Sequence, residues 1–79
     1  MKLTIIHSDR AVYKDNIVYL DLILEGTPEN VHALQWKDNE GWIEFNDGTS
    51  NQNITELPQW ALNAIDAWTT ADTTPTLGE

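Results

Sequence analysis

The sequence predicts an α+β domain in which a small antiparallel β-meander of four to five strands packs against one C-terminal helix. Three observations carry this prediction. Short runs rich in β-branched and aromatic residues fill the first two thirds of the chain, polar turn signals separate them, and an apolar pattern of helical period follows. Because no repeat or linker divides the chain, we expect one domain over residues 1–70 and a tail over residues 71–79.

Three strands are expected in the first third of the chain. Residues 2–7 and 11–13 are predicted as short strands, separated by Ser8-Asp9-Arg10. Residues 17–25 give the clearest alternation, after a polar turn at residues 14–16. One face of this strand carries Val18, Leu20, Leu22 and Leu24, and the other carries Ile17, Tyr19, Asp21, Ile23 and Glu25. We expect the first face to meet the core and the second to be partly exposed or to contact a partner.

A hairpin is the strongest local signal. Residues 31–37 and 42–46 are predicted as paired strands around the loop DNEG, which ends in the glycine that such loops favour, Gly41. On the first of these strands, His32, Leu34 and Trp36 are expected to share the face that meets the core.

The closing segment is predicted as a helix that ends near Thr69 or Thr70. Pro58 suits its first turn. The apolar face consists of Leu57, Trp60, Ala61, Ala64, Ile65 and Trp68. The tail that follows is rich in threonine and has little to bury, so we expect it to be flexible unless a partner orders it.

Size and charge exclude several classes of function. The chain has 79 residues, no cysteine, 13 acidic and 4 basic residues, and a net charge of −9. So few cations argue against binding to nucleic acid or to an anionic membrane. The first ten residues hold only a very short apolar run, so we do not expect a signal peptide, and no run approaches the ~20 apolar residues of a membrane span. Without disulfides, a domain of this size often gains stability by forming a homo-oligomer.

No catalytic, metal or cofactor site is expected. His7-Ser8-Asp9 is better explained as a turn than as a nucleophile with its base, and His32 as a packed or rim residue. Two histidines are too few for a convincing zinc site, and the acidic loops lack the ligand spacing of an EF-hand. Turn chemistry explains the Asp, Asn and Gly residues of these loops equally well.

A contact surface for another protein is the functional feature that the residues do predict. Most of the four tryptophans should build the core, since a small domain needs large side chains. One exposed tryptophan would serve as an interface anchor. We therefore expect the partner to contact Trp42 together with Ile17, Tyr19 and Ile23 from the second face of the strand over residues 17–25.

Several segments resemble a group of small, mostly uncharacterised tailed-bacteriophage proteins. The similar segments are VHALQW (31–36), GWIEF (41–45), ITELP (54–58) and the closing AIDAW (64–68), with a less specific likeness in SDRAVYKDN (8–16). The resemblance covers roughly residues 31–68, about half of the chain. It implies a phage origin and synthesis in the host cytoplasm, and it assigns no catalytic residue.

Two functions fit this origin. Phage genes of this size commonly encode virion parts, assembly factors or inhibitors of host proteins. We expect a non-enzymatic virion or tail-associated structural or accessory component, whose partner is another virion protein or a second copy of itself. The alternative is an acidic inhibitor of a host defence or nucleic-acid-handling protein, in which the charge of −9 mimics a phosphate backbone.

Overall fold

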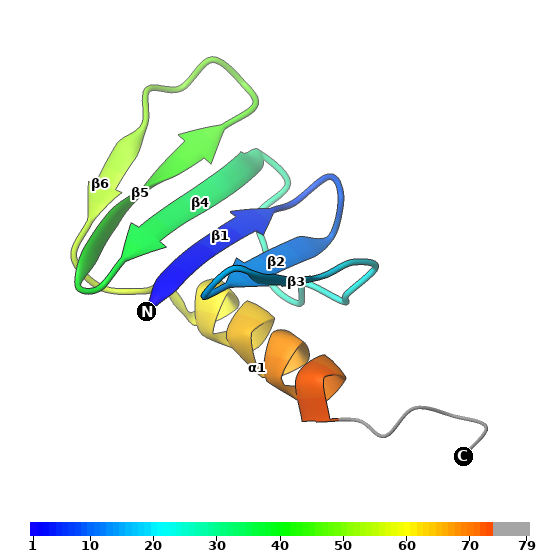
Figure 1. Ribbon diagram of the computed structural model, residues 1–79. Coiled ribbons are helices and arrows are strands. Elements are labelled where there is room, and N and C mark those ends of the chain that lie inside the picture. Colours follow the sequence, from blue (N-terminus) through cyan, green and yellow to red (C-terminus); the bar gives the residue numbers. More distant parts are fainter. Residues whose placement is uncertain (74–79) are drawn as a thin grey trace.

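A six-stranded antiparallel sheet and one helix form the two layers of the computed structural model, which describes residues 1–73 (Figure 1). The predicted α+β class, an antiparallel sheet packed against a C-terminal helix, is confirmed. The structure has six strands where four to five were expected, and the strand over residues 52–54 lies in a segment for which no strand was predicted. The elements are β1 (Lys2–Ile6), β2 (Ala11–Lys14), β3 (Ile17–Tyr19), β4 (Val31–Lys37), β5 (Glu40–Phe45), β6 (Gln52–Ile54) and α1 (Gln59–Thr73).

The strand order is more complex than a meander. Across the sheet it is β3-β2-β1-β4-β5-β6, and every neighbouring pair is antiparallel. The first four strands form a Greek key, because β4 returns to lie beside β1 and not beside β3. The connection from β3 to β4 must therefore travel past β2 and β1 (Figure 1).

Residues 20–30 make this connection, and we call them the crossing loop. The predicted strand over residues 17–25 was wrong beyond Tyr19, because the chain turns at Asp21, whose φ is 59°. The N–H of Leu22 then donates to the carbonyl of Arg10 at 3.0 Å. Leu22 and Leu24 pack against the core, while Leu20 is 59% exposed. Leu22 and Leu24 thus cover the core from a loop and not from a strand, whereas Val18 and Leu20, which were expected on the same core-facing side, are exposed.

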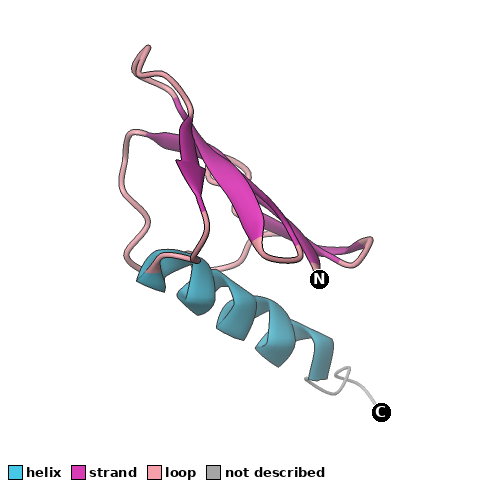
Figure 2. Cartoon of the chain, turned by 90° about the vertical axis from the view of Figure 1, so that its left-hand side faces the viewer, coloured by secondary structure: helices cyan, strands magenta, loops and turns pink. Residues whose placement is uncertain are grey.

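The core lies between one face of the sheet and α1, which Figure 2 shows on a single side of the strands. Two small residues of the helix, Ala61 and Ala64, are fully buried, which allows a close approach to the sheet. Trp68 closes the far end of the core. The buried cluster consists of Leu3, Ile5, Val12, Val31, Leu34, Trp36, Ile43, Ala61, Ala64 and Trp68.

Helix α1 extends beyond its predicted end, and hydrogen bonds from Tyr19 and Thr73 hold its last turn. The Tyr19 hydroxyl donates to an Asp72 carboxylate oxygen at 2.7 Å, and the Thr73 hydroxyl donates to the carbonyl of Thr69 at 2.9 Å. The helix consequently continues to Thr73, although it was expected to end near Thr69 or Thr70. Of the predicted tail, residues 71–73 belong to α1, and residues 74–79 lie outside the described part of the chain.

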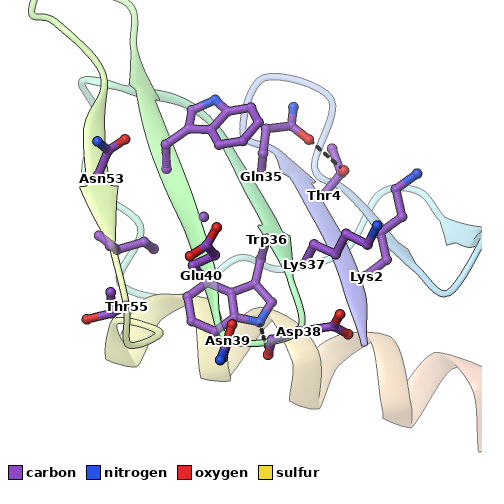
Figure 3. Close-up of a pocket in the computed structure, with 13 residues that line it drawn as sticks. Lys2, Thr4, Gln35, Trp36, Lys37, Asp38, Asn39, Glu40, Asn53 and Thr55 are labelled. Atoms are coloured by element: carbon purple, nitrogen blue, oxygen red, sulfur yellow. Dashed lines mark hydrogen bonds between the residues drawn. The ribbon is translucent and has the colours of Figure 1, made fainter.

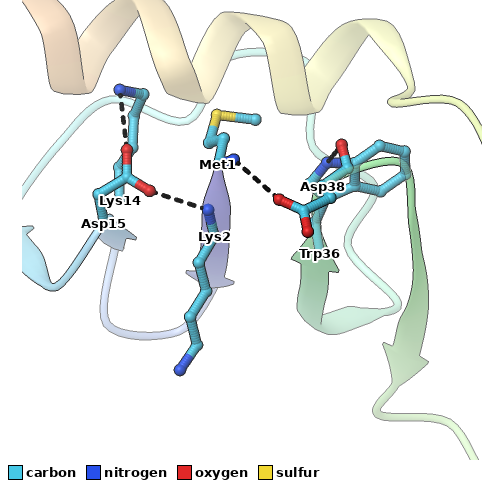
Figure 4. A network of polar contacts seen from close by, with 6 residues as sticks. All are labelled: Met1, Lys2, Lys14, Asp15, Trp36 and Asp38. Atoms are coloured by element: carbon cyan, nitrogen blue, oxygen red, sulfur yellow. Dashed lines mark hydrogen bonds and ion pairs between the residues drawn. The ribbon is translucent and has the colours of Figure 1, made fainter.

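Two hairpin turns form hydrogen bonds with the residues at the start of β1 (Figure 4). The N–H of Asp15 donates to the carbonyl of Lys2, and the Asp15 carboxylate accepts from the N–H of Lys2, both at 2.9 Å. On the other side, the N–H of Asp38 donates to the Met1 carbonyl at 2.8 Å, and the Met1 ammonium donates to the Asp38 carboxylate at 3.2 Å. Both aspartates have positive φ, which frees their backbone for this geometry.

The Asp15 contact predicts a pH dependence of stability. The Lys2 N–H holds the pKa of the Asp15 carboxyl below its ordinary value of 3.8, with the Lys14 ammonium contributing less. A lowered folded-state pKa stabilises the fold fully above the unfolded-state value, and this contribution is lost as the pH falls through the folded-state value. We expect Asp15→Asn to be less stable than the parent at neutral pH and to lose less stability below pH 3.8. Denaturant unfolding across this range checks it, and parallel pH profiles would contradict it.

A bulge in β4 corrects the predicted placement of His32. The register between β4 and β5 shifts between Val31 and Ala33, so one extra residue lies on β4. Val31 and Leu34 therefore both face the core, whereas His32 is exposed. The prediction that His32 shares a face with Leu34 and Trp36 was wrong, because a strict two-residue alternation does not continue through a bulge.

Candidate functional site

One face of the sheet is left uncovered by α1, and we call it the open face. Its position follows from the register, since Leu3, Ile5, Val12, Leu34 and Ile43 point into the core and the residues between them point the other way. One row of directly paired residues crosses this face on all six strands. From β3 to β6 the row is Val18, Tyr13, Thr4, Gln35, Trp42 and Asn53.

Aromatic and apolar side chains lie on both sides of a polar centre in this row. Tyr13 and Trp42 are each 42% exposed, and Val18 is 39% exposed. Between the two rings, the Thr4 hydroxyl donates to the Gln35 side-chain oxygen at 2.8 Å. The open face therefore presents two partly exposed rings, separated by a hydrogen-bonded polar pair.

Two adjoining hollows make this face concave. The larger, of about 670 Å³, extends from β1 across β4 and β5 to β6 (Figure 3). The smaller, of about 260 Å³, lies between β1 and the β2–β3 hairpin, where Tyr13 and Asn16 line it. Both hollows are lined by Lys2 and Thr4, so they meet at β1, and we call the two together the open-face groove. Its larger part falls within the volume range of typical ligand sites.

Two tryptophans of the β4–β5 hairpin have different roles. The Trp42 indole N–H donates to a Glu44 carboxylate oxygen at 2.8 Å, which fixes the exposed ring along β5. Trp36 is only 7% exposed, and its indole N–H donates to the Asp38 carbonyl at 3.1 Å. Trp36 thus supports the turn at one end of the groove, and Trp42 offers its ring to the solvent.

Of the four residues predicted to contact a partner, only Trp42 lines the groove. Tyr19 lies on the helix side of the sheet, where its ring meets Trp68 edge to face at 5.6 Å. Ile17 is half exposed at the β3 edge, and Ile23 is 79% exposed in the crossing loop. Ile17 and Tyr19 are two residues apart on β3, so both lie on the helix side of the sheet and not on the open face with Trp42. Ile23 does not belong to that strand face, because β3 ends at Tyr19.

Sequence reasoning did not identify Tyr13 and Val18 as surface residues of the same site. The register between β2 and β3 could have been predicted from the short turn at Asp15 and Asn16. Their φ angles of 51° and 73° are those of a two-residue turn of type I′. Such a turn pairs Lys14 with Ile17 and therefore Tyr13 with Val18. A strand extended to residue 25 concealed this register.

The polar loops are held by their own hydrogen bonds. The Arg10 N–H donates to the His7 carbonyl at 3.1 Å, which makes residues 7–10 the turn that was predicted. The Thr49 hydroxyl and N–H hold the pKa of the Asp47 carboxyl below its ordinary range.

Within residues 1–73, no group of three or more His, Asp or Glu side chains is arranged to hold a metal ion.

The fold and the groove define a small antiparallel sheet protein with one face covered by a helix and the other face open. Compared with known proteins, the chain matches no family model, no curated protein sequence and no solved structure. Over the same residues 1–73, no helix is long and apolar enough to cross a membrane.

Proposed function

We propose that this protein acts without catalysis, by binding another protein through the open face of its sheet. The observation that carries the proposal is the row of Tyr13, Val18 and Trp42, which no element of residues 1–73 covers. Solvent-facing sides of antiparallel sheets usually carry polar residues. Partly exposed Tyr and Trp side chains are the residues that most often dominate the binding energy of protein interfaces.

The setting that we propose is a bacteriophage particle, in which the protein is a virion or tail-associated structural or accessory component made in the host cytoplasm. The resemblance to tailed-phage proteins supports this setting. Its segments at residues 31–36 and 41–45 build most of β4 and β5, and thereby supply Gln35 and Trp42 to the groove. The partner is then another virion protein or a second copy of this chain.

The alternative, an acidic inhibitor of a host defence or nucleic-acid-handling protein, is supported less well by the placement of the carboxylates. Mimicry of a phosphate backbone requires an aligned stripe of negative charge. Of the acidic residues within residues 1–73, two lie on β5 and two on α1. The other eight are distributed over six different connections between elements.

Protein mass spectrometry of purified phage particles tests the setting. We expect the protein at a fixed copy number per particle. Its absence from particles would contradict the virion proposal.

A variant test then asks whether the open face is responsible. Tyr13→Ser combined with Trp42→Ser, supplied in trans, should reduce incorporation into particles at least about ten-fold, as the loss of two interface anchors predicts. Leu20→Ser combined with Ile23→Ser is the matched control, since both residues are exposed but lie in the crossing loop. Equal incorporation of the two double variants would show that the open face is not the binding surface.

A further inference from the structure

We propose that the segment that occupies the open-face groove is acidic: an extended stretch of a partner protein with one or two carboxylates beside an aromatic or aliphatic side chain. This inference rests on the proposed function and specifies the chemistry of the partner. It is drawn from the position of Lys2 and Lys37 next to the exposed aromatic rings of the groove.

The two lysines are direct cross-strand neighbours. Lys2 on β1 pairs with Lys37 on β4, and both residues are exposed at the same end of the open face. Figure 3 shows their side chains extending next to each other at the border of the larger hollow. Two of the four basic residues of a chain with net charge −9 are therefore placed together. Like charges directly opposite each other disfavour the pairing, and a bound anion relieves this repulsion.

No carboxylate within residues 1–73 forms an ion pair with either lysine. The three ion pairs of this part of the chain use the Met1 ammonium, Arg10 and Lys14. Glu40 is the cross-strand neighbour of Lys37 on β5, yet the two side chains form none of these ion pairs. The ammonium groups of Lys2 and Lys37 are consequently available to an incoming anion.

The groove places the two lysines beside surfaces suited to a peptide. Two carboxylates line the same hollow: that of Asp38 pairs with the Met1 ammonium, and that of Glu40 forms no ion pair within residues 1–73. Lys2 lines both hollows, and Lys37 lines the larger one with Trp42. The Gln35 side-chain oxygen accepts from Thr4, and the Gln35 amide N–H groups form no hydrogen bond within residues 1–73, so they can donate to a peptide carbonyl. A carboxylate at the lysines and an apolar side chain on the Trp42 ring can therefore be contacted at the same time.

A short acidic segment fits this charge distribution better than nucleic acid does. Two lysines neutralise at most about two phosphates, and the remaining negative charge of the domain repels a polyanion. Attraction to the lysine pair is confined to about 8–10 Å at physiological salt. One or two carboxylates fall within that distance, whereas most phosphates of a longer nucleic acid lie outside it.

Selection from a displayed library of random octapeptides on the full-length protein tests the inference, since it offers all side-chain chemistries equally. We expect enrichment of sequences in which Asp or Glu adjoins Trp, Phe or Leu. For a synthetic copy of an enriched peptide, Lys2→Gln or Lys37→Gln should each raise Kd about two- to five-fold. The double variant should raise it about five- to twenty-fold, and added salt should weaken binding.

Arg10→Gln is the matched control, because it removes the same charge from the turn between β1 and β2, away from the groove. Its Kd should equal that of the parent. The inference is overturned by enrichment of neutral or basic peptides, by an empty selection, or by equal affinity of the double lysine variant. Tighter binding of an octamer of deoxythymidylate than of any selected peptide would replace the acidic segment with a nucleic acid.

These outcomes are separable from failure of the proposed function. The double variant Tyr13→Ser, Trp42→Ser could be lost from particles while the double variant Lys2→Gln, Lys37→Gln is incorporated normally. The open face then binds a partner, but the bound segment of that partner is not acidic. If both variants are incorporated normally, the open face itself is not the binding surface.

Discussion

Replacing Trp68 with alanine is expected to lower the free energy of unfolding by about 3–5 kcal/mol, the range for deleting a large buried aromatic side chain. Trp68 is 7% exposed, and its indole N–H donates to the Ile17 carbonyl at 2.9 Å. Its ring also contacts Tyr19, and the Lys14 ammonium lies 4.6 Å from the ring centroid. One side chain therefore joins the end of α1 to both β2 and β3.

Since a domain of this size is stable by only about 4–12 kcal/mol, Trp68→Ala should bring the chain close to unfolding at room temperature. Urea unfolding followed by circular dichroism measures the change. Trp42→Ala, the same substitution on the open face, should cost less than about 1 kcal/mol. Trp68→Phe keeps an aromatic ring and loses the hydrogen bond, so we expect a loss of about 1–2 kcal/mol. Similar losses for Trp68→Ala and Trp42→Ala would contradict this account of the core.

The elements that the sequence predicted well are those determined by neighbouring residues. The β4–β5 hairpin follows from alternation around a polar turn, and α1 follows from apolar residues at helical spacing. The prediction of these elements was wrong only in small, local details. The turn contains two residues, Asp38 and Asn39, and not four, because Lys37 pairs directly with Glu40.

The strand order could not be predicted because distant residues decide it. β1 lies at the centre of the sheet between two hairpins, where the turns at Asp15 and Asp38 hold its first residues. The crossing loop exists because β4 pairs with β1. Only the resulting path explains why Leu22 and Leu24 pack against the core without forming a strand. Leucines that alternate in a strand and leucines that alternate in this loop have the same spacing along the chain, so alternation alone cannot distinguish the strand from the loop.

The candidate site was predicted only through Trp42, for the same reason. Tyr13, Thr4 and Gln35 come from three strands, and the register between those strands is what aligns them in one row. Likewise, Lys2 and Lys37 are separated by most of the first half of the chain and become neighbours only through the pairing of β1 with β4. A candidate surface built across several strands therefore cannot be predicted from motifs along the chain.

Gly41 was expected to serve a turn, but its role in the structure is to let two strands pack closely. It lies within β5, where it pairs with Trp36 on one side and Ile54 on the other. A Cβ atom at this position would overlap the Gln35 carbonyl oxygen and lie 2.9 Å from the Trp36 Cα. Both neighbours are backbone atoms, so no side-chain rotation can relieve the contact.

Gly41→Ala should therefore destabilise the protein by about 3 kcal/mol or more, at the upper end of the cost of overpacking, because β4 and β5 must separate where they hold the groove. Gly48→Ala is the control. Gly48 has open space around it and a φ of 88°, so the same substitution costs only the backbone strain, about 1–2 kcal/mol. Denaturant unfolding compares the two variants. A smaller loss for Gly41→Ala than for Gly48→Ala would show that the strands yield to the added methyl group, and that the β4–β5 spacing does not depend on glycine.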